Sequence, residues 1–393
     1  MKPLEDLLVL EFSQYMSGPL AGLKLADLGA RIIKVEPPVT GEGGRNIDIK
    51  GMYVDDNSLL FHTINRNKES YVANLKVEED FQKVENLIAR ADVMTHNFRP
   101  GVMESLGLDY KRVNKINPQI VYAEISGYGT DGPWSGKPGQ DLLIQAMSGL
   151  TYLSGDRGDL PTPFGLSVID ILCGNYLVQG ILASLVQRGK TNEGAHVEIS
   201  LLETALDLQF EVITTFLNDG GKLPNRAKQG NAHAYLGAPY GIYKTVNGYL
   251  ALAMTGLDKL GKIVGLESLG DYSDKDYFDR RDEIMDKLRA VFKTKSTDEW
   301  LAQLEPADIW CADVKGYKEF LNHKAYQILD MDQTLELTNG KELTTTRCPI
   351  RIDEKRFFSS IAAPQLGEHT KGIDKEFALD MTYEENIHEV KEN

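Results

Sequence analysis

Asp170 stands in surroundings that suit a chemical role for a carboxylate. It is the only charged residue between Asp159 and Arg188, within a run of apolar and small residues. The apolar residues that follow it recur at helical spacing, which predicts a mostly buried helix whose first turn begins at or next to Asp170. The dipole of that helix would help to keep the carboxylate ionised.

Two interpretations of Asp170 follow from this position. Asp is strongly preferred as an N-cap, where its side chain accepts backbone N–H groups and its role is structural. A carboxylate at a helix start in apolar surroundings is also a poised nucleophile of the kind that forms covalent acyl intermediates. The two interpretations are compatible, and Asp170 alone does not decide whether the second holds.

The composition limits the classes of partner. The 393 residues carry 58 acidic and 43 basic side chains, which gives a formal net charge of −15. This balance argues against nucleic acid as the main partner, because binding a phosphate backbone needs a basic surface. It leaves room for a small anionic ligand in a local basic pocket. The length and the 42% hydrophobic content predict two domains with a substantial core.

Cysteine usage and the apolar segments predict a cytoplasmic protein. The three cysteines, Cys173, Cys311 and Cys348, are far apart and show neither a disulfide framework nor zinc-ligand spacing. The N-terminal residues run directly into a strand pattern and lack the features of a signal peptide. The long uncharged stretch after Asp170 is interrupted by glycine and amide residues, which favours a core helix over a membrane span.

Strand and helix patterns alternate along the first 200 residues. Strand patterns lie at 7–12, 31–35, 71–75, 93–95, 120–126 and 195–199. Helix patterns between them predict a doubly wound, Rossmann-like α/β sheet of parallel strands. Beyond 217, a hairpin pattern at 240–255 and helix patterns at 257–264, 281–293 and 297–304 predict a smaller α+β region.

Three segments follow from this alternation and from a linker-like stretch at 218–225. Residues 1–217 are expected to form the first part of a large α/β domain. Residues 226–325 are expected to form a small α+β domain. Residues 326–393 are expected to return to the large domain and to end in a charged C-terminal tail.

A glycine motif in the first half raises the question of a dinucleotide. Gly127–Gly132 matches G-x-G-x-x-G after a predicted strand, but the residues from Pro133 onward do not open a helix. We therefore interpret the segment as a plain loop. Glu36 ends a strand where dinucleotide-binding folds keep a ribose-binding acid. The glycine fingerprint of a dinucleotide site is therefore incomplete, which makes a nicotinamide-dependent oxidoreductase a less favoured function.

Asn97–Gly101 follows a predicted strand, at the edge where open α/β sheets bind ligands. It is either a helix-entry turn with a solvated Arg99, or a site where Asn97 and Arg99 hold a phosphate or an adenine ribose. The residues alone leave both open. The seven histidines are scattered, and no carboxylate or cysteine group shows metal-ligand spacing, so no metal site is expected.

Several ordered blocks together resemble the class III CoA-transferases, the CaiB/BaiF family that includes formyl-CoA transferase, carnitine CoA-transferase and the α-methylacyl-CoA racemases. The resemblance runs over most of the chain. The blocks are residues 17–37, 97–107, 126–133, 138–149, the segment around Asp170, and 194–203.

The resemblance implies an enzyme in which Asp170 is the nucleophile. Asp170 would form an aspartyl anhydride with the acyl group and then an aspartyl-CoA thioester, and an acceptor carboxylate would reverse these steps. CoA and acyl-CoA are then substrates, with no tightly bound cofactor, and the protein is an intertwined, ring-like homodimer. The resemblance places CoA contacts at Gln14, Tyr15, Lys34, Asn97, Phe98, Arg99 and Gly101.

Three positions depart from the related families, and two of them, Met16 and Gln140, become candidates for the substrate site. Gln14 and Met16 stand where formyl-CoA transferase has His and Gln, which argues against an oxalate or formate specificity. Gln140 occupies the block in which the racemases carry a His, so CoA transfer is favoured over an acyl-CoA racemase or isomerase. Residues 216–221 and 307–314 resemble carnitine CoA-transferase more than the formyl enzyme. This favours a carnitine-like acceptor or another small carboxylic acid.

Overall fold

The computed structural model describes residues 2–359 and 361–379, which form two compact units. Within the described residues, the large unit consists of 2–144, 167–204 and 329–379, and the small unit of 145–166 and 205–328. Two of the boundaries between the units along the sequence fall within α6 (Asp141–Met147) and α8 (Leu201–Leu208).

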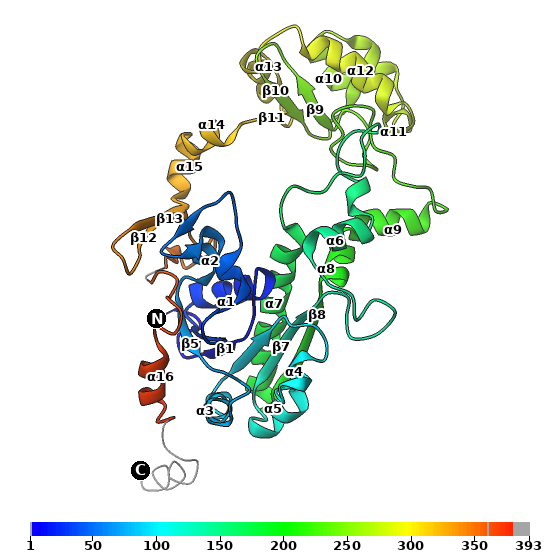
Figure 1. Cartoon of the computed structure of the whole chain (residues 1–393). Coiled ribbons are helices and arrows are strands. Elements are labelled where there is room, and N and C mark those ends of the chain that lie inside the picture. Colours follow the sequence, from blue (N-terminus) through cyan, green and yellow to red (C-terminus); the bar gives the residue numbers. More distant parts are fainter. Residues whose placement is uncertain (1, 360, 380–393) are drawn as a thin grey trace. The chain divides into compact units, whose positions relative to one another are not determined.

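A six-stranded parallel sheet forms the centre of the large unit (Figure 1). Its strand order is β5-β2-β1-β6-β7-β8, so the chain first builds outward from β1 on one side and then on the other. This reversal is the doubly wound topology that the alternating pattern predicts. The strands are β1 (Leu8–Glu11), β2 (Arg31–Glu36), β5 (Lys68–Val72), β6 (Val93–His96), β7 (Val121–Ser126) and β8 (Ala195–Ser200).

Helices cover both faces of this sheet. On one face α3 (Glu78–Ile88) and α5 (Tyr110–Ile116) bury apolar residues against the strands. On the other face α1 (Ser17–Asp27) and α7 (Val168–Thr191) pack against each other and against the sheet. The remaining elements are η1 (Gly43–Asn46), β3 (Tyr53–Val54), β4 (Asn57–Ser58), α2 (Leu59–Asn65), α4 (Val102–Ser105), β12 (Asp332–Glu336), β13 (Glu342–Thr346), β14 (Arg351–Ile352), β15 (Lys355–Arg356) and α16 (Thr370–Glu376).

Helix α7 is long and apolar enough to cross a membrane by length and composition alone. It lies along α1, β7 and β8, and its side chains Cys173, Leu177 and Ile181 are buried there. These contacts make α7 a core helix of the large unit, as its interrupted apolar pattern predicts.

The small unit holds a three-stranded antiparallel sheet in the order β11-β10-β9. Aromatic side chains of Tyr243, Phe292 and Trp300 pack together in its core. Helix α13 begins with a capping box between Ser296 and Glu299. The elements are η2 (Leu150–Tyr152), α9 (Phe210–Asn218), β9 (Gly241–Lys244), β10 (Tyr249–Leu252), α10 (Leu257–Val264), η3 (Glu267–Asp271), α11 (Asp276–Asp279), α12 (Arg281–Phe292), α13 (Thr297–Leu304), η4 (Glu305–Ala307), β11 (Cys311–Asp313), α14 (Tyr317–Leu321) and α15 (Lys324–Leu329).

The division between the units differs from the segments expected from sequence. Residues 145–166 and 205–217, which the sequence pattern places in the large domain, belong to the small unit. The reason is a set of non-local contacts: the Arg157 guanidinium bonds to Asn225, to the carbonyl of Arg226 and to Asp282. The large domain does resume near the predicted position, at Leu329. Residues 380–393 of the predicted tail lie outside the described residues.

Candidate functional site

A cavity of about 210 Å³ opens at the carboxyl ends of β1, β2, β5 and β6. This edge of the sheet, where the strand order reverses, is where doubly wound folds bind their ligands. Gln14 and Phe98, two of the residues that the resemblance implicates, line the cavity. The other lining residues are Phe12, Val35, Glu36, Pro37, Glu42, Ala73, Asn74, Leu75, Lys76 and Leu106.

Asn97 holds the turn that follows β1. Its side-chain oxygen accepts the backbone N–H of Gln14 at 2.8 Å, and its side-chain amide donates to the Gln14 carbonyl at 2.7 Å. Both hydrogen-bonding groups of the amide are therefore engaged with protein backbone. In this structure Asn97 positions Gln14 at the cavity.

The next residue, Tyr15, has a positive φ of 65° and a side chain that is 52% exposed. A positive φ is uncommon for a bulky residue, and such strain gathers at functional sites. The carboxylate of Glu42 holds this conformation by accepting the backbone N–H of Tyr15 at 2.9 Å. The Tyr15 ring packs against Gly43, where an added Cβ would lie 2.6 Å from the ring carbon Cε1. Tyr15 thus stands fixed and exposed beside the cavity turn.

Lys34 lies beneath the same turn and is fully buried. Its ammonium contacts Glu11 Oε1 at 2.9 Å and the Ser13 carbonyl at 2.7 Å, with Glu42 Oε1 at 3.6 Å. Burial opposes the charge, but the nearby carboxylates outweigh it and raise the pKa of Lys34. The structure therefore gives Lys34 a supporting role in place of the direct CoA contact that the resemblance implies.

Asp170 is the third residue of α7, which begins at Val168, so the N-cap interpretation of Asp170 is wrong. The carboxylate that caps this helix is Asp141. Its Oδ2 accepts the backbone N–H of Ile169 at 2.8 Å and that of Asp170 at 3.0 Å. The side chain of Asp170 is thereby free of the structural duty that most helix-start aspartates perform.

Two neighbours set the electrostatics of the Asp170 carboxyl group. Burial, followed by the charge of Asp141, raises the pKa of Asp170 to about 7, while a hydrogen bond with the Ser17 side chain acts in the opposite direction. Gly174, one turn further along α7, allows α7 to approach the start of α1, because a Cβ at this position would lie 2.7 Å from the Ser17 carbonyl oxygen. The start of α7 is therefore pressed against the start of α1.

The turn of residues 14–17 connects the cavity with Asp170. Gln14 lines the cavity, and Ser17 contacts the carboxyl group of Asp170. Met16, between them, is half-buried at the position preceding α1. An extended ligand with a flat group in the cavity could therefore run along this turn and bring its far end to Asp170.

The other predicted residues lie at the margins. Arg99 and Gly101 are exposed in the loop after β6, and Gly101 needs its glycine because its φ is 87°. Gln140 is exposed beside the buried Asp141. In Gly127–Gly132, a Cβ on Gly127 would lie 2.8 Å from the backbone of Gly139, and the next helix starts only at Asp141. The glycines of this loop allow two backbone segments to meet.

Sequence reasoning missed three residues of this region: Asp141, Asn74 and Lys76. Asn74 and Lys76 follow β5 at its carboxyl end and line the cavity. Like Asn97–Gly101, they come directly after a strand, at the edge where open α/β sheets bind ligands, so their position in the sequence does carry a signal. Asp141 lies 28 residues or more from the backbone groups that it caps, and no local pattern reveals such a contact.

Comparisons with known proteins agree over nearly the whole chain. The sequence model of CoA-transferase family III matches residues 4–370. The chain is 31% identical over 386 residues to the succinyl-CoA:glutarate CoA-transferase of Mus musculus, covering 96% of this chain and 86% of that protein. It is 39% identical over 243 residues to the acetyl-CoA:oxalate CoA-transferase of Acetobacter aceti, covering 62% of this chain and 61% of that protein.

Solved structures show the same relationship. A CaiB/BaiF family protein from Brucella suis superposes with a TM-score of 0.79 at 29% identity, covering 96% of this chain and 99% of that one. Rv3272 from Mycobacterium tuberculosis superposes with a TM-score of 0.80 at 27% identity, covering 94% and 98%. These matches confirm the resemblance drawn from the sequence blocks. The chain therefore belongs to CoA-transferase family III, the CaiB/BaiF family of CoA-transferring enzymes.

Proposed function

We propose that this enzyme transfers CoA from an acyl-CoA donor to a small carboxylic acid, with Asp170 as the covalent nucleophile. The observation that carries the proposal is a carboxyl group at a helix start whose structural capping is done by another residue, Asp141. Its pKa of about 7 leaves a reactive carboxylate available at neutral pH. The turn of residues 14–17 links this group to the cavity, as an extended substrate requires.

The proposed chemistry proceeds by exchange at two carbonyl groups. An oxygen of Asp170 attacks the thioester carbonyl of the donor, and CoA leaves as the thiolate, which forms a mixed anhydride. The thiolate then attacks the Asp170 carbonyl, releases the donor acid as a carboxylate and leaves an aspartyl-CoA thioester. The acceptor carboxylate attacks the Asp170 carbonyl of that thioester, which releases the CoA thiolate and forms a second mixed anhydride. The thiolate then attacks the acceptor's carbonyl in this anhydride, which yields the acceptor's CoA thioester and frees the Asp170 carboxylate. No step consumes water, so a site that excludes it conserves the thioester.

CoA is proposed to bind with its nucleotide end in the cavity. The side chains of Phe98 and Leu75 offer apolar faces for the adenine ring, and Lys76 is a cation at the same cavity. Arg99 lies in the adjoining exposed loop. Phosphates of CoA at the mouth of the cavity would then meet these two cations, with which they form charge-assisted hydrogen bonds. The substrate is held without any tightly bound cofactor.

The Arg99→Ala variant is expected to bind CoA more weakly by about 1.5–3 kcal/mol, the range for a hydrogen bond to a charged group. Lys76→Ala should show a loss in the same direction. Titration calorimetry with CoA measures both, and Lys111→Ala, an exposed lysine on α5, is the matched control that should bind as the wild type does. Unchanged affinity in Arg99→Ala would show that Arg99 is a solvated turn residue.

The acceptor is proposed to be a small carboxylic acid, either carnitine-like or a dicarboxylic acid. The dicarboxylic class is supported by the relative named for glutarate. Incubating the enzyme with a panel of acyl-CoA donors and acids, followed by mass spectrometry of the CoA esters, would identify the pair. Absence of any new CoA ester across the panel would count against CoA transfer to small acids. The reaction is proposed to take place in the cytoplasm.

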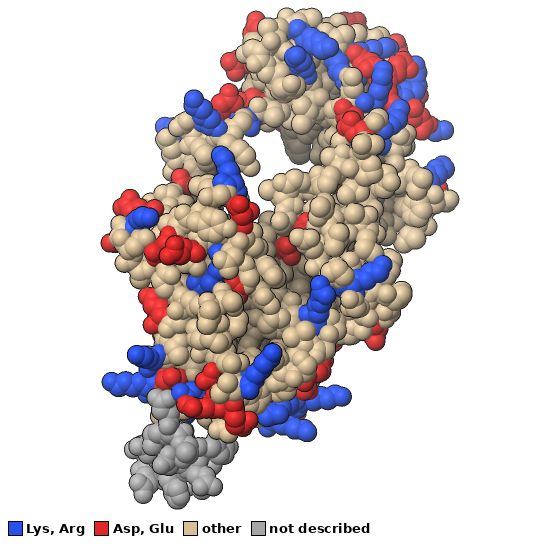
Figure 2. All heavy atoms as spheres, viewed as in Figure 1, with Lys and Arg blue, Asp and Glu red and all other residues tan. Residues whose placement is uncertain are grey.

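A second copy of the chain is proposed to complete the enzyme as an intertwined homodimer. Helix α9 supports this, because it has no buried residue although apolar side chains form a stripe along it. Phe210 and Leu217 are 67% and 71% exposed, and the surface over α9 carries few charged side chains in Figure 2. By contrast, charges of both signs gather over α3 and α5. Light scattering at micromolar concentration should report a dimer, and a monomer would contradict it.

The pH dependence of kcat/KM should follow ionisation of Asp170. Activity is expected to rise with pH and to level off above about 7, because only the ionised carboxylate attacks. Asp141→Asn removes the charge that raises this pKa but keeps an oxygen for the helix cap. The rising limb should therefore move to lower pH in Asp141→Asn, while the exposed Asp131→Asn should leave it in place. An unshifted limb in Asp141→Asn would show that another group controls it.

A further inference from the structure

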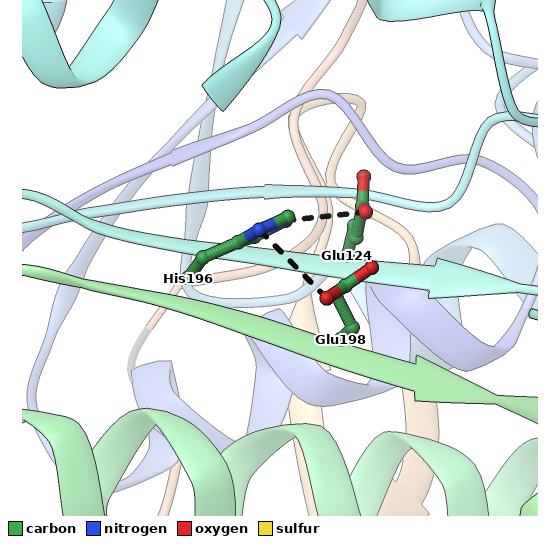
Figure 3. A group of neighbouring side chains, drawn as sticks. All are labelled: Glu124, His196 and Glu198. Atoms are coloured by element: carbon green, nitrogen blue, oxygen red, sulfur yellow. Dashed lines mark hydrogen bonds and ion pairs between the residues drawn. The ribbon is translucent and has the colours of Figure 1, made fainter. Parts of the chain in front are cut away.

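Glu124, His196 and Glu198 converge on one face of the large unit's sheet, and none of them lines the cavity (Figure 3). Strands β7 and β8 pair in parallel with Glu124 opposite Glu198, which brings the two carboxylates to the same side. His196 Nε2 lies 3.2 Å from Glu124 Oε1, and its Nδ1 lies 3.9 Å from Glu198 Oε2. One donor atom from each residue lies within 4.8 Å of the others.

Neighbouring side chains hold these groups in place. The second oxygen of Glu124 lies 2.9 Å from Nε2 of the buried His96, which also contacts the Tyr122 hydroxyl at 2.8 Å. The ring of Tyr110 stacks on His196 with 4.5 Å between centroids and 16° between planes. Metal-binding side chains are oriented by outer contacts of this kind.

The cluster offers a cation two carboxyl groups and one imidazole within 4.8 Å of one another. The side chain of Glu198 is 55% exposed and that of His196 is 27% exposed, so the cluster is open to solvent. Carboxylate oxygen and imidazole nitrogen are both ligand types that a divalent cation such as Zn²⁺ accepts.

We propose that Glu124, His196 and Glu198 form a binding site for a divalent transition-metal cation such as Zn²⁺. Imidazole nitrogen and carboxylate oxygen are zinc ligands at about 2.0–2.2 Å, so two ligands of one ion lie about 3–3.5 Å apart. The 3.2 Å between His196 Nε2 and Glu124 Oε1 matches this spacing. One carboxylate oxygen of Glu198 lies within 4.8 Å of the other two ligand atoms, and its half-exposed side chain has room to move closer. The exposed side of the cluster provides an entry path and room for water as a further ligand. The ion would tie the edge strand β8 to β7.

The proposed site differs from the sequence-based expectation of no metal site. Glu124 is 72 residues from His196, so the ligands show no spacing motif along the chain. Only the register of β7 and β8 brings them together. The site is separate from the proposed CoA transfer, and its test does not depend on that reaction.

The test is calorimetric titration of ZnCl₂ into the full-length, EDTA-treated protein at neutral pH. The wild type should bind one equivalent per chain at this site, and Zn²⁺ should raise its thermal midpoint, because a ligand that binds the folded state stabilises it. His196→Gln and Glu198→Gln should each bind at least about tenfold more weakly and lose that stabilisation. His323→Gln, an exposed histidine of the small unit, is the control that should behave as the wild type does.

Two results would overturn the proposal. If the wild type binds no Zn²⁺, His196 is simply the protonated partner of two carboxylates. If the variant with both His196→Gln and Glu198→Gln binds Zn²⁺ as tightly as the wild type, the ion sits elsewhere. Because both side chains are partly exposed, circular dichroism of these variants should show a native fold, which keeps either result interpretable.

Discussion

Replacing Asp170 by Asn should abolish CoA transfer and leave the fold intact. The amide keeps the shape of the side chain but cannot act as an oxygen nucleophile, so turnover should fall by on the order of 10⁴-fold or more. The helix cap is unaffected, because Asp141 supplies it. Steady-state formation of the product CoA ester, compared with the wild type at pH 8, measures the loss.

Thermal stability separates this loss from misfolding. The pKa of Asp170 is raised from its usual 3.8 to about 7, so the folded state keeps the proton that the unfolded chain loses between these pH values. The contribution of Asp170 to stability is therefore complete below pH 3.8. That contribution disappears as the pH rises through about 7, where the buried charge forms. Asp170→Asn avoids the charge and should be at least as stable as the wild type at pH 8. An active variant would exclude Asp170 as the nucleophile.

Replacing Glu11 by Gln should cause the largest loss of stability among the substitutions considered. Glu11 is fully buried between two fully buried ammonium groups, with Lys34 and Lys68 each 2.9 Å from its oxygens. Removing one partner of a buried ion pair leaves an uncompensated charge and costs about 3–5 kcal/mol. Chemical denaturation should show this as a lower free energy of unfolding.

The pH dependence of this deficit gives a second check. Burial lowers the pKa of Lys68 to about 8 even with Glu11 present, so Lys68 sheds its proton readily once Glu11 is neutralised. The deficit of Glu11→Gln should therefore shrink as the pH is raised.

Glu376→Gln is the matched control for Glu11→Gln. Its ion pair with Arg31 is solvent-exposed, with side-chain exposures of 51% and 32%, and such pairs contribute at most about 1 kcal/mol. Equal losses of stability in Glu11→Gln and Glu376→Gln would contradict the account of the buried cluster. Lys34, which contacts Glu11, also donates to the Ser13 carbonyl next to the cavity turn, so the loss of Glu11 would reach that turn through Lys34.

The sequence predicts those parts of the fold that depend on local periodicity. The strands of the large sheet, the helix at 257–264 and the capped helix at 297–304 each carry their signal within their own residues. The boundary of the small unit depends on contacts of Arg157 with residues more than 60 positions away, which no local pattern contains. Strand alternation likewise gives no sign that Lys34 is buried, because its partner Glu11 lies on another strand.

The same distinction applies to the site. Asp170 stands out because its neighbours in sequence are uncharged, and Gln14 and Phe98 follow strand ends that meet at the cavity. The cap from Asp141 and the cluster of Glu124, His196 and Glu198 arise only when separate segments pack together.

Covalent capture of the acyl intermediate tests the central claim most directly. The wild-type enzyme is incubated with a competent acyl-CoA donor and hydroxylamine, which attacks an activated aspartyl carbonyl, and is then digested for peptide mass spectrometry. We expect a hydroxamate on the peptide that contains Asp170, with loss of activity in proportion to its formation. The Asp170→Asn variant should carry no such modification. A wild-type enzyme that turns over the same donor and acceptor but is never modified at Asp170 would contradict the proposed mechanism.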